Sequence, residues 1–469
     1  MYAKDYVAFF QDVAKGDDKG ERQIMVISAE TGECVNTRMA GPAPDGFWFF
    51  DVATNRNRLY LFYVRETNNG RKKIIVGQWF DLPSLDSGGL MEILQFDVPE
   101  GETMHLDIPG ITTEPPPETV RKSDSNYLKF HSNHRTETIA MTHTHAKLID
   151  DTRVFSAWCF DSSLNLLSKG STPVGQIPMS IQTIDKIVTN SKGEGVMLID
   201  HHASLKLGSL MRRERTTHLL KLDKNGLVLI PDPIPPGPSI ASRGLLIVDG
   251  EPLIAGVYPN AGESAENARL RHVFICRPFS ASQETVTIEL EQPFATSSIS
   301  ILPKGDDAFT IFSDGPINLE KNSASSSKMN VVTVSLNGDI YSEAEYILPR
   351  MIPISGRHRL GRNNTYVIPQ ILSFPFFHKG LLMVFFENIR SNFRAAGGGQ
   401  LITNQKDDKI GIGLAVFVNQ MEPSITEIEV KDPHAWLIDL DDEIMDGIFW
   451  NRTLKNNGMI AGFNRITIH

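Results

Sequence analysis

The chain has 469 residues, of which 41% are hydrophobic and 22% charged, as is ordinary for a folded globular protein. Its formal net charge of -10 argues against a general nucleic-acid binder, because such a protein presents a basic footprint. Its three cysteines form no CxxC pair, which argues against a disulfide framework or a structural zinc site. We find no apolar run of about 18 residues, so we expect no transmembrane segment.

In chain order, we predict six repeats of four short strands each. They cover residues 46–107, 127–174, 184–233, 240–290, 297–348 and 366–430. The strands within residues 1–42 and the tail over residues 434–469 are each incomplete, and together they supply a seventh repeat. Four-strand repeats of roughly 50–60 residues are typical of propeller blades.

The clearest turn signal lies in the third of these repeats. Apolar runs on both sides of Asp223-Lys224-Asn225-Gly226 predict a β-hairpin, because Gly readily takes the positive φ of a tight turn. A similar signal occurs at Asn337-Gly338-Asp339. Hardly any stretch has the apolar period of a helix, so we expect almost no helix.

These patterns predict an all-β fold, a single β-propeller domain over residues 1–469. We expect seven four-stranded blades, closed into a ring by pairing of the N- and C-terminal strands, which leaves no open edge. Six or eight blades are alternatives, because strand boundaries read from sequence carry errors of a few residues. A further alternative is two β-sandwich domains divided near Pro235.

Four connections between second and third strands are predicted to be long loops, at residues 201–217, 259–271, 314–328 and 388–409. Such connections all lie on one face of a propeller, so they predict a binding face. Two of these loops carry a surplus of Arg and Lys over an acidic body, which indicates an anionic partner. The candidate partner-binding residues are Lys206, Leu210, Met211, Arg212, Arg213, Arg215, Arg390 and Arg394. Solvated loops without a partner are the alternative.

Histidines concentrate between His131 and His145. The spacing of His143 and His145 puts both on one face of a strand, a geometry that can hold a divalent metal. A half-exposed structural strand is the alternative. The acidic run over residues 439–446 lacks the spacing of a calcium loop and reads as a turn. No motif predicts a catalytic residue.

Several segments resemble the repeats of uncharacterised β-propeller-like proteins of the Bacteroidota cell envelope. They are RVFSAWCFDSSLNLLSKGS, THLLKLDKNG, NVVTVSLNGDIYSEAEYILP and IPQILSFPFFHKGLLMVFFENIRSN, all within residues 153–392. The resemblance implies an exported, often lipid-anchored protein, and it carries over no catalytic residues. The start of the chain departs from that pattern, since it has neither a leader nor a lipobox cysteine.

Together these features predict a non-enzymatic interaction or scaffold module that binds a protein partner on the long-loop face, as a subunit of a cell-envelope complex. One alternative is a hydrolase or lyase acting on polysaccharide at the mouth of the central channel. Another is a metal-dependent enzyme that uses the histidines of residues 131–145. We expect no cofactor apart from that divalent metal. If a leader has been removed, the protein belongs to the envelope or periplasm, and membrane association comes through a complex or a lost lipid anchor; otherwise the protein is cytoplasmic.

Overall fold

The computed structural model describes the chain mainly as strands and short turns. The described residues are 2–3, 6–12, 22–28, 31, 33–67, 72–97, 103–106, 125–147, 152–172, 182–207, 210–235, 242–262, 269–280, 285–295, 298–316, 325–352, 358–359, 366–367, 373–378, 380–389, 410–417, 423–428, 448–455 and 458–465. By their contacts, the residues divide into two compact units. Unit 1 comprises Met1–Asp232, Gly250–Leu253 and Arg277–Glu284, and unit 2 comprises Pro233–Asp249, Ile254–Cys276 and Thr285–His469.

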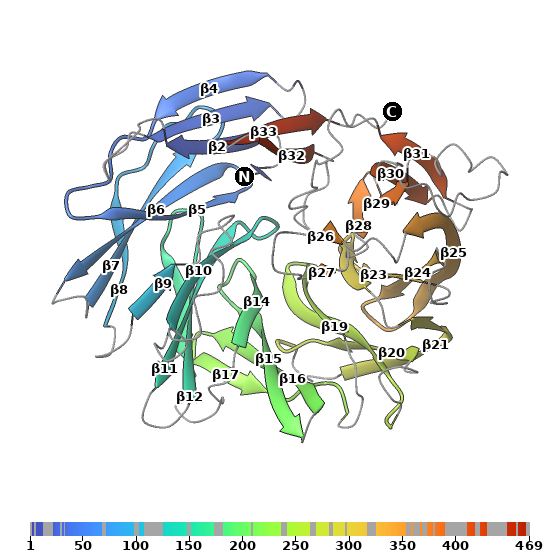
Figure 1. Ribbon diagram of the computed structural model, residues 1–469. Coiled ribbons are helices and arrows are strands. Elements are labelled where there is room, and N and C mark those ends of the chain that lie inside the picture. Colours follow the sequence, from blue (N-terminus) through green and yellow to red (C-terminus); the bar gives the residue numbers. More distant parts are fainter. Residues whose placement is uncertain are drawn as a thin grey trace. The chain divides into compact units, whose positions relative to one another are not determined.

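In the described part of unit 1, strands that follow one another along the chain form four sheets (Figure 1). The first contains β1 (Tyr2–Ala3), β2 (Tyr6–Asp12), β3 (Arg22–Ser28) and β4 (Cys34–Met39). The second contains β5 (Trp48–Asn55), β6 (Arg58–Thr67), β7 (Lys72–Asp81) and β8 (Met91–Asp97). The third contains β9 (Thr103–Leu106), β10 (Ser125–Asn133), β11 (Thr138–Lys147), β12 (Thr152–Phe160) and β13 (Leu166–Ser171). The fourth contains β14 (Gln182–Thr189), β15 (Gly195–Leu207), β16 (Leu210–Asp223) and β17 (Gly226–Ile230).

Three more four-stranded sheets have most of their residues in unit 2. The fifth contains β18 (Ser242–Val248), β19 (Glu251–Pro259), β20 (Arg269–Cys276) and β21 (Thr285–Ala295). The sixth contains β22 (Ser298–Lys304), β23 (Ala308–Pro316), β24 (Ser325–Ser335) and β25 (Ile340–Ile352). The seventh contains β28 (Ser373–His378), β29 (Leu381–Ile389), β30 (Ile410–Phe417) and β31 (Ser424–Ile428). Two hairpins join β26 (His358–Arg359) to β27 (Tyr366–Val367) and β32 (Ile448–Lys455) to β33 (Gly458–Arg465).

The described residues thus form seven sheets of at least four strands and no helix. Successive four-stranded antiparallel meanders are the repeating unit of a propeller, so the prediction of an all-β, propeller-type fold is confirmed. Within this part of the chain, no helix is long and apolar enough to cross a membrane. Closure through the two ends of the chain and organisation as a single domain stay predictions.

The strand assignment differs from the sequence prediction near the N-terminus and between the second and third sheets. The N-terminal segment supplies four strands by itself, because the short β1 pairs with β2 through Tyr2↔Val7 and Ala3↔Tyr6. The sequence pattern instead predicts that this segment is completed by strands of the tail. In addition, β9 leaves the second sheet and pairs in parallel with β10, over Ser125 to Leu128. Both differences come from two- to four-residue strands, which carry little periodic signal.

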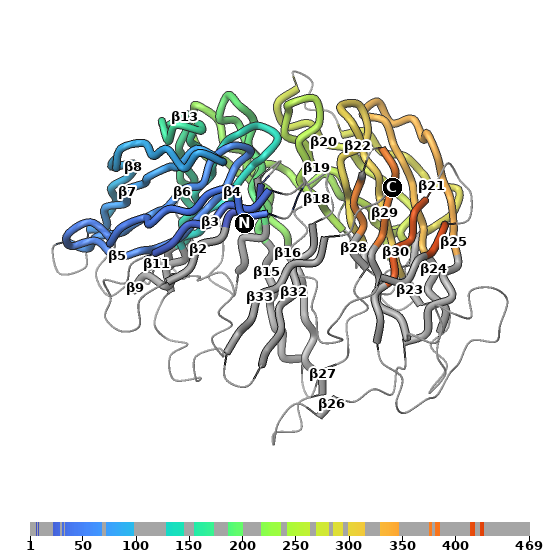
Figure 2. Tube along the Cα trace, turned by 90° about the horizontal axis from the view of Figure 1, so that it is seen from above, coloured from blue at the N-terminus to red at the C-terminus, as the bar shows by residue number. Residues whose placement is uncertain are grey.

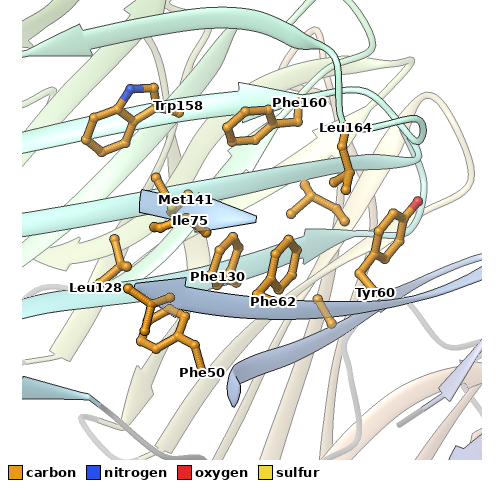
Figure 3. Close-up of a cluster of buried hydrophobic side chains, with 13 residues drawn as sticks. Phe50, Tyr60, Phe62, Ile75, Leu128, Phe130, Met141, Trp158, Phe160 and Leu164 are labelled. Atoms are coloured by element: carbon orange, nitrogen blue, oxygen red, sulfur yellow. The ribbon is translucent and has the colours of Figure 1, made fainter. Parts of the chain in front are cut away.

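Successive sheets of unit 1 pack face to face through alternating apolar residues. In Figure 2 the strands of the second sheet, β5–β8 in blue, run side by side. β6 is buried at six successive positions, residues 59–64, because one of its faces packs against the first sheet and the other against the third. Phe62 of β6 and Phe130 of β10 stack with ring centroids 3.7 Å apart, at the centre of the cluster in Figure 3. A continuous apolar run in β6 is the consequence of burial on both faces.

The turn predicted in the fourth sheet is present. Gly226 has a φ of 127°, and the backbone N–H of Asn225 donates to Oδ1 of Asp223 at 2.7 Å. Asp161 stabilises the corresponding turn of the third sheet, where its Oδ1 accepts hydrogen bonds from the N–H groups of Ser163 and Asn165 at 2.8 and 2.9 Å. Short polar side chains therefore stabilise both turns locally.

Candidate partner-binding face

A long hairpin stands where we predicted a loop over residues 201–217. β15 and β16 pair continuously from Gly195↔Leu222 to Leu207↔Leu210. β14 pairs with β15 only as far as His201, and β17 pairs with β16 only from Leu219. The loop prediction was therefore wrong: residues 202–207 and 210–215 form a two-stranded ribbon of six residue pairs beyond the four-stranded part of the sheet. At about 3.3 Å per residue, the ribbon adds roughly 20 Å.

The sequence contained a signal for this ribbon. Between residues 201 and 217 the sequence has no proline, and its only glycine is Gly208. A Gly-Ser pair between two strand-compatible runs favours a two-residue hairpin connection. The charge of the segment does not by itself exclude a strand at the end of a sheet.

The register sorts the predicted binding residues onto two faces of the ribbon, since residues paired across it share a face and neighbours along a strand alternate. One face takes Lys206, Met211, Arg213 and Arg215, through the pairs Lys206↔Met211, Ser204↔Arg213 and His202↔Arg215. Three of these four residues are cations, so this face of the ribbon is basic. We call Lys206, Arg213 and Arg215 the basic face.

The opposite face of the ribbon is mostly apolar. It takes Arg212 opposite Leu205, and Leu210 opposite Leu207 at the end of the paired region. The hairpin is therefore amphipathic, a property that the sequence shows only once the register is known.

The remaining predicted binding residues, Arg390 and Arg394, lie outside the described residues, after β29 has paired with β30 through Ile389↔Ile410. In the sixth sheet, pairing continues to Pro316↔Ser327, so part of the loop predicted over residues 314–328 is also strand. Lys73, near the start of β7 in the second sheet, is buried and forms an ion pair with Glu66 on the neighbouring strand. Burial lowers the pKa of Lys73, and this lysine adds no exposed cation to the face.

The histidines do not form one cluster on the third sheet. Nε2 of His131 lies 3.0 Å from Oγ1 of Thr142. Because Thr142 and His143 are neighbours on β11, His131 and His143 belong to opposite faces of the sheet. His143 is 3% exposed, and its ring centroid lies 4.8 Å from that of Phe96. His145 follows on β11, but its side chain is outside the described residues.

No group of three potential metal ligands occurs among the residues that the structure describes. The metal site at His143 and His145 stays a prediction, and its further ligands would have to come from the face of the third sheet that packs against Phe96 of β8. The acidic run over residues 439–446 lies outside the described residues.

The sequence reasoning missed a second group of polar residues, on the other face of the third sheet. Lys129 and His131 on β10 share that face with Thr142 and Thr144 on β11, and β14 contributes Lys186 nearby. Alternation of Lys129 and His131 with Leu128 and Phe130 was visible in the sequence. Their meeting with a residue about 55 positions away was not, because it depends on sheet-to-sheet packing.

The sheet topology places this chain among all-β proteins of the propeller type. No protein-family model matches it, and a search of curated proteins finds no significant match. Among solved structures it is similar to the beta-propeller domain of the Trilobed protease from Pyrococcus furiosus, with 11% identity, a TM-score of 0.34, and coverage of 88% of this chain and 90% of that chain.

Two further solved structures are similar at the same low level. A post-proline cleaving enzyme from Rickettsia typhi has 10% identity and a TM-score of 0.37. The match covers 96% of this chain and 54% of that chain, so this chain spans about half the length of that enzyme. A polysaccharide lyase described as an ulvan lyase has 11% identity and a TM-score of 0.31, with coverage of 74% and 76%. At these identities and TM-scores, none of the likenesses bears on the activity or ligand of this chain.

Proposed function

We propose that this protein is a non-enzymatic interaction module of the propeller type, which binds an acidic protein partner through the β15–β16 ribbon. The observation that carries the proposal is the register of the ribbon, which gathers Lys206, Arg213 and Arg215 on one face. Three cations on one side of a hairpin favour a carboxylate-bearing surface, and arginine in particular binds carboxylates in a bidentate way.

The ribbon suits a binding role because it extends beyond the four-stranded part of the sheet. Its residues pair with each other beyond the end of β14 and before the start of β17. The four-stranded part of the sheet carries the core residues, for example Met197, Ile199 and Leu220. A basic hairpin on a rigid scaffold, in a chain with a net charge of -10, concentrates positive potential at one place.

The decisive experiment removes the ribbon and leaves the sheet. In one variant, residues 202–215 are replaced by Asn-Gly, which can join the paired residues His201 and Thr216 by a two-residue turn. A second variant combines Lys206→Glu, Arg213→Glu and Arg215→Glu. The control combines Lys169→Glu and Lys224→Glu, two exposed lysines at the other end of the third and fourth sheets.

Each variant is expressed with an affinity tag in the native host, and co-purifying proteins are quantified at several salt concentrations. We expect a stoichiometric partner with the natural protein and the control, weakened by salt, and a loss of at least about tenfold with both ribbon variants. A partner that stays bound after the ribbon has been removed would refute the proposal. So would a monomer without any partner across the salt series.

The cell-envelope setting is a further part of the proposal and is supported by the resemblance of the segments within residues 153–392 to envelope propeller-like repeats. Fractionation of cells that express the natural full-length protein tests it. Recovery with the envelope or periplasm supports this setting, and recovery entirely in the cytoplasm contradicts it while leaving the ribbon proposal intact.

A further inference from the structure

The β15–β16 ribbon has an edge that no described strand covers. β17 pairs with β16 only from Leu219 onward, so over residues 210–215 no described strand pairs with the side of β16 that faces away from β15. Backbone N–H and C=O groups of a strand point alternately to its two sides, so about half of those in this stretch point away from β15. This side of β16 can therefore accept a further strand. We call residues 210–215 of β16 the open edge.

The open edge differs in charge from the opposite edge of the ribbon. β15 extends beyond β14 over residues 202–207, where Lys206 is its only lysine or arginine. The open edge of β16 carries three arginines and a single carboxylate, that of Glu214. A strand added to β16 therefore lies beside more positive charge than one added to β15, and an acidic segment favours the open edge.

Two arginines of the open edge have the spacing of alternate residues in a strand. Arg213 and Arg215 share one face of the ribbon and lie about 7 Å apart along β16. A segment paired with β16 presents every second side chain on that face, directly opposite a residue of β16. Carboxylates at two alternate positions of the segment therefore meet Arg213 and Arg215. Glu214 lies on the other face and disfavours a carboxylate between those two positions.

A second copy of this chain fits the open edge poorly. Antiparallel pairing of two copies centred on Arg213 brings Arg213 and Arg215 of one copy close to the same arginines of the other. Like charges directly opposite each other destabilise a pair of strands. Charge complementarity instead favours a different chain, with an extended segment that has aspartate or glutamate at alternate positions.

We propose that the acidic partner binds by adding an extended segment to the open edge as a further strand, with acidic side chains at alternate positions. Backbone hydrogen bonds supply affinity, and the contacts of Arg213 and Arg215 with the two carboxylates fix the register. The inference rests on the proposed function, because it states how the partner of the ribbon is held. It adds that the partner contributes its main chain to the interface as well as charged side chains.

The probe is a labelled peptide, Val-Thr-Glu-Thr-Glu-Thr-Val, which reads the same in both directions and so suits either strand orientation. Its affinity for the full chain is measured by fluorescence anisotropy at low salt. We expect saturable binding that weakens at least about tenfold in the double variant Arg213→Glu with Arg215→Glu. Lys169→Glu with Lys224→Glu is the control, with unchanged affinity. The lysine peptide Val-Thr-Lys-Thr-Lys-Thr-Val should prefer the double variant over the natural protein.

Backbone methylation separates strand addition from attraction between charges alone. The N–H groups of a paired strand point alternately toward its neighbour and away from it, so only methyl groups on the set that faces β16 block pairing. One peptide is N-methylated on its threonines and another on its glutamates. We expect one of the two to lose affinity by at least about tenfold and the other to retain it.

Equal effects of the two methylations would overturn strand addition, and so would the absence of saturable binding of the unmethylated peptide. Undiminished binding of Val-Thr-Glu-Glu-Thr-Thr-Val, whose adjacent glutamates fall on opposite faces, would overturn the alternate register. None of these results alters the co-purification of a partner, which tests the proposed function, so the two proposals fail separately. Sedimentation of the natural protein tests the remaining occupant: a dimer that dissociates when residues 202–215 are replaced would assign the edge to a second copy and overturn the proposal.

Discussion

Single side chains connect neighbouring sheets of unit 1 at their turns. Arg58, at the start of β6, donates from Nε to Oδ1 of Asp81 at 2.8 Å and from Nη1 to the carbonyl oxygen of Ser162 at 2.6 Å. Its guanidinium carbon also lies 4.0 Å from the centroid of the Trp79 ring. One residue of the second sheet thereby holds the turn of the third sheet that contains Ser162.

Arg58→Ala should destabilise the protein by about 2 kcal/mol, because it removes charge-assisted hydrogen bonds and a cation–π contact together. The matched control is Arg56→Ala. Nη1 of Arg56 lies 3.9 Å from Glu137, and both side chains are more than 40% exposed, so we expect a change within about 0.5 kcal/mol. Urea denaturation measures both. Equal changes in unfolding free energy for the two substitutions would show that the contacts of Arg58 do not stabilise the protein.

The pKa of His131 makes stability depend on pH. Its value of about 3 in the folded state lies below the ordinary 6.5 of an unfolded chain, so between these values the unfolded state binds the additional proton. Stability is complete above pH 6.5 and is lost as the pH falls toward 3. From pH 7 to pH 5 the loss from this residue is about 2 kcal/mol.

His131→Gln removes this titration and keeps a group that can hydrogen-bond to Thr142. We expect the difference in unfolding free energy between pH 7 and pH 5 to shrink by about 2 kcal/mol in the variant, measured by urea melts at both pH values. An unchanged pH dependence would show that His131 is protonated in the folded protein.

Elements of adjacent sheets approach most closely where a glycine permits it. A Cβ on Gly170 of β13 would lie 2.1 Å from the backbone nitrogen of Leu227 on β17. The third and fourth sheets therefore touch backbone to backbone at this position, and no side chain fits between them. Glycine is required at position 170 by the close approach of the neighbouring sheet, and not by the backbone conformation of β13 itself.

Gly170→Ala should destabilise the protein by about 1–3 kcal/mol, since a backbone atom cannot rotate away as a side chain can. Gly89→Ala is the control, because a Cβ there meets no atom within 4 Å. We expect it to change the unfolding free energy by no more than about 0.5 kcal/mol. Chemical denaturation of the two variants compares them, and a tolerated alanine at position 170 would contradict the close approach.

At the scale of the molecule, the hydrophobic clusters described in unit 1 span two neighbouring sheets at once. The cluster around Phe62 and Phe130 joins the second and third sheets, and Cys159 packs with Leu220 and Leu227 between the third and fourth. In unit 2, Phe312 and Val384 join the sixth and seventh sheets in the same way. A repeat fold of this kind is stabilised largely by interfaces between neighbours.

Phe130→Ala should therefore lower hydrogen-exchange protection in both the second and the third sheet, although the substitution lies in only one of them. The expected cost is about 3–5 kcal/mol, because the ring is buried and stacked on Phe62. Mass spectrometry of exchanged peptides from β5–β8 and β10–β13 makes the comparison. Loss of protection confined to β10–β13 would mean that the two sheets are stabilised separately.

Local sequence patterns were sufficient for the strands and turns of most sheets. Asp223 and Gly226 predicted their hairpin because the signal is contained in four adjacent residues, and the apolar run of β6 predicted a strand. The basic residues around Arg213 were recognised from composition alone. The ribbon that carries them was not, because pairing over residues 202–215 depends on the strands that anchor it.

The sequence by itself determined the class of fold and most of the strands, because both depend on neighbouring residues. Only the tertiary structure decided which residues share a face. It separated His131 from His143, brought β14, which carries Lys186, against β10, and showed that Lys73 is buried against Glu66. The physical reason is that a shift of one residue in register exchanges the two faces of a strand, and register is set by packing between distant segments of the chain.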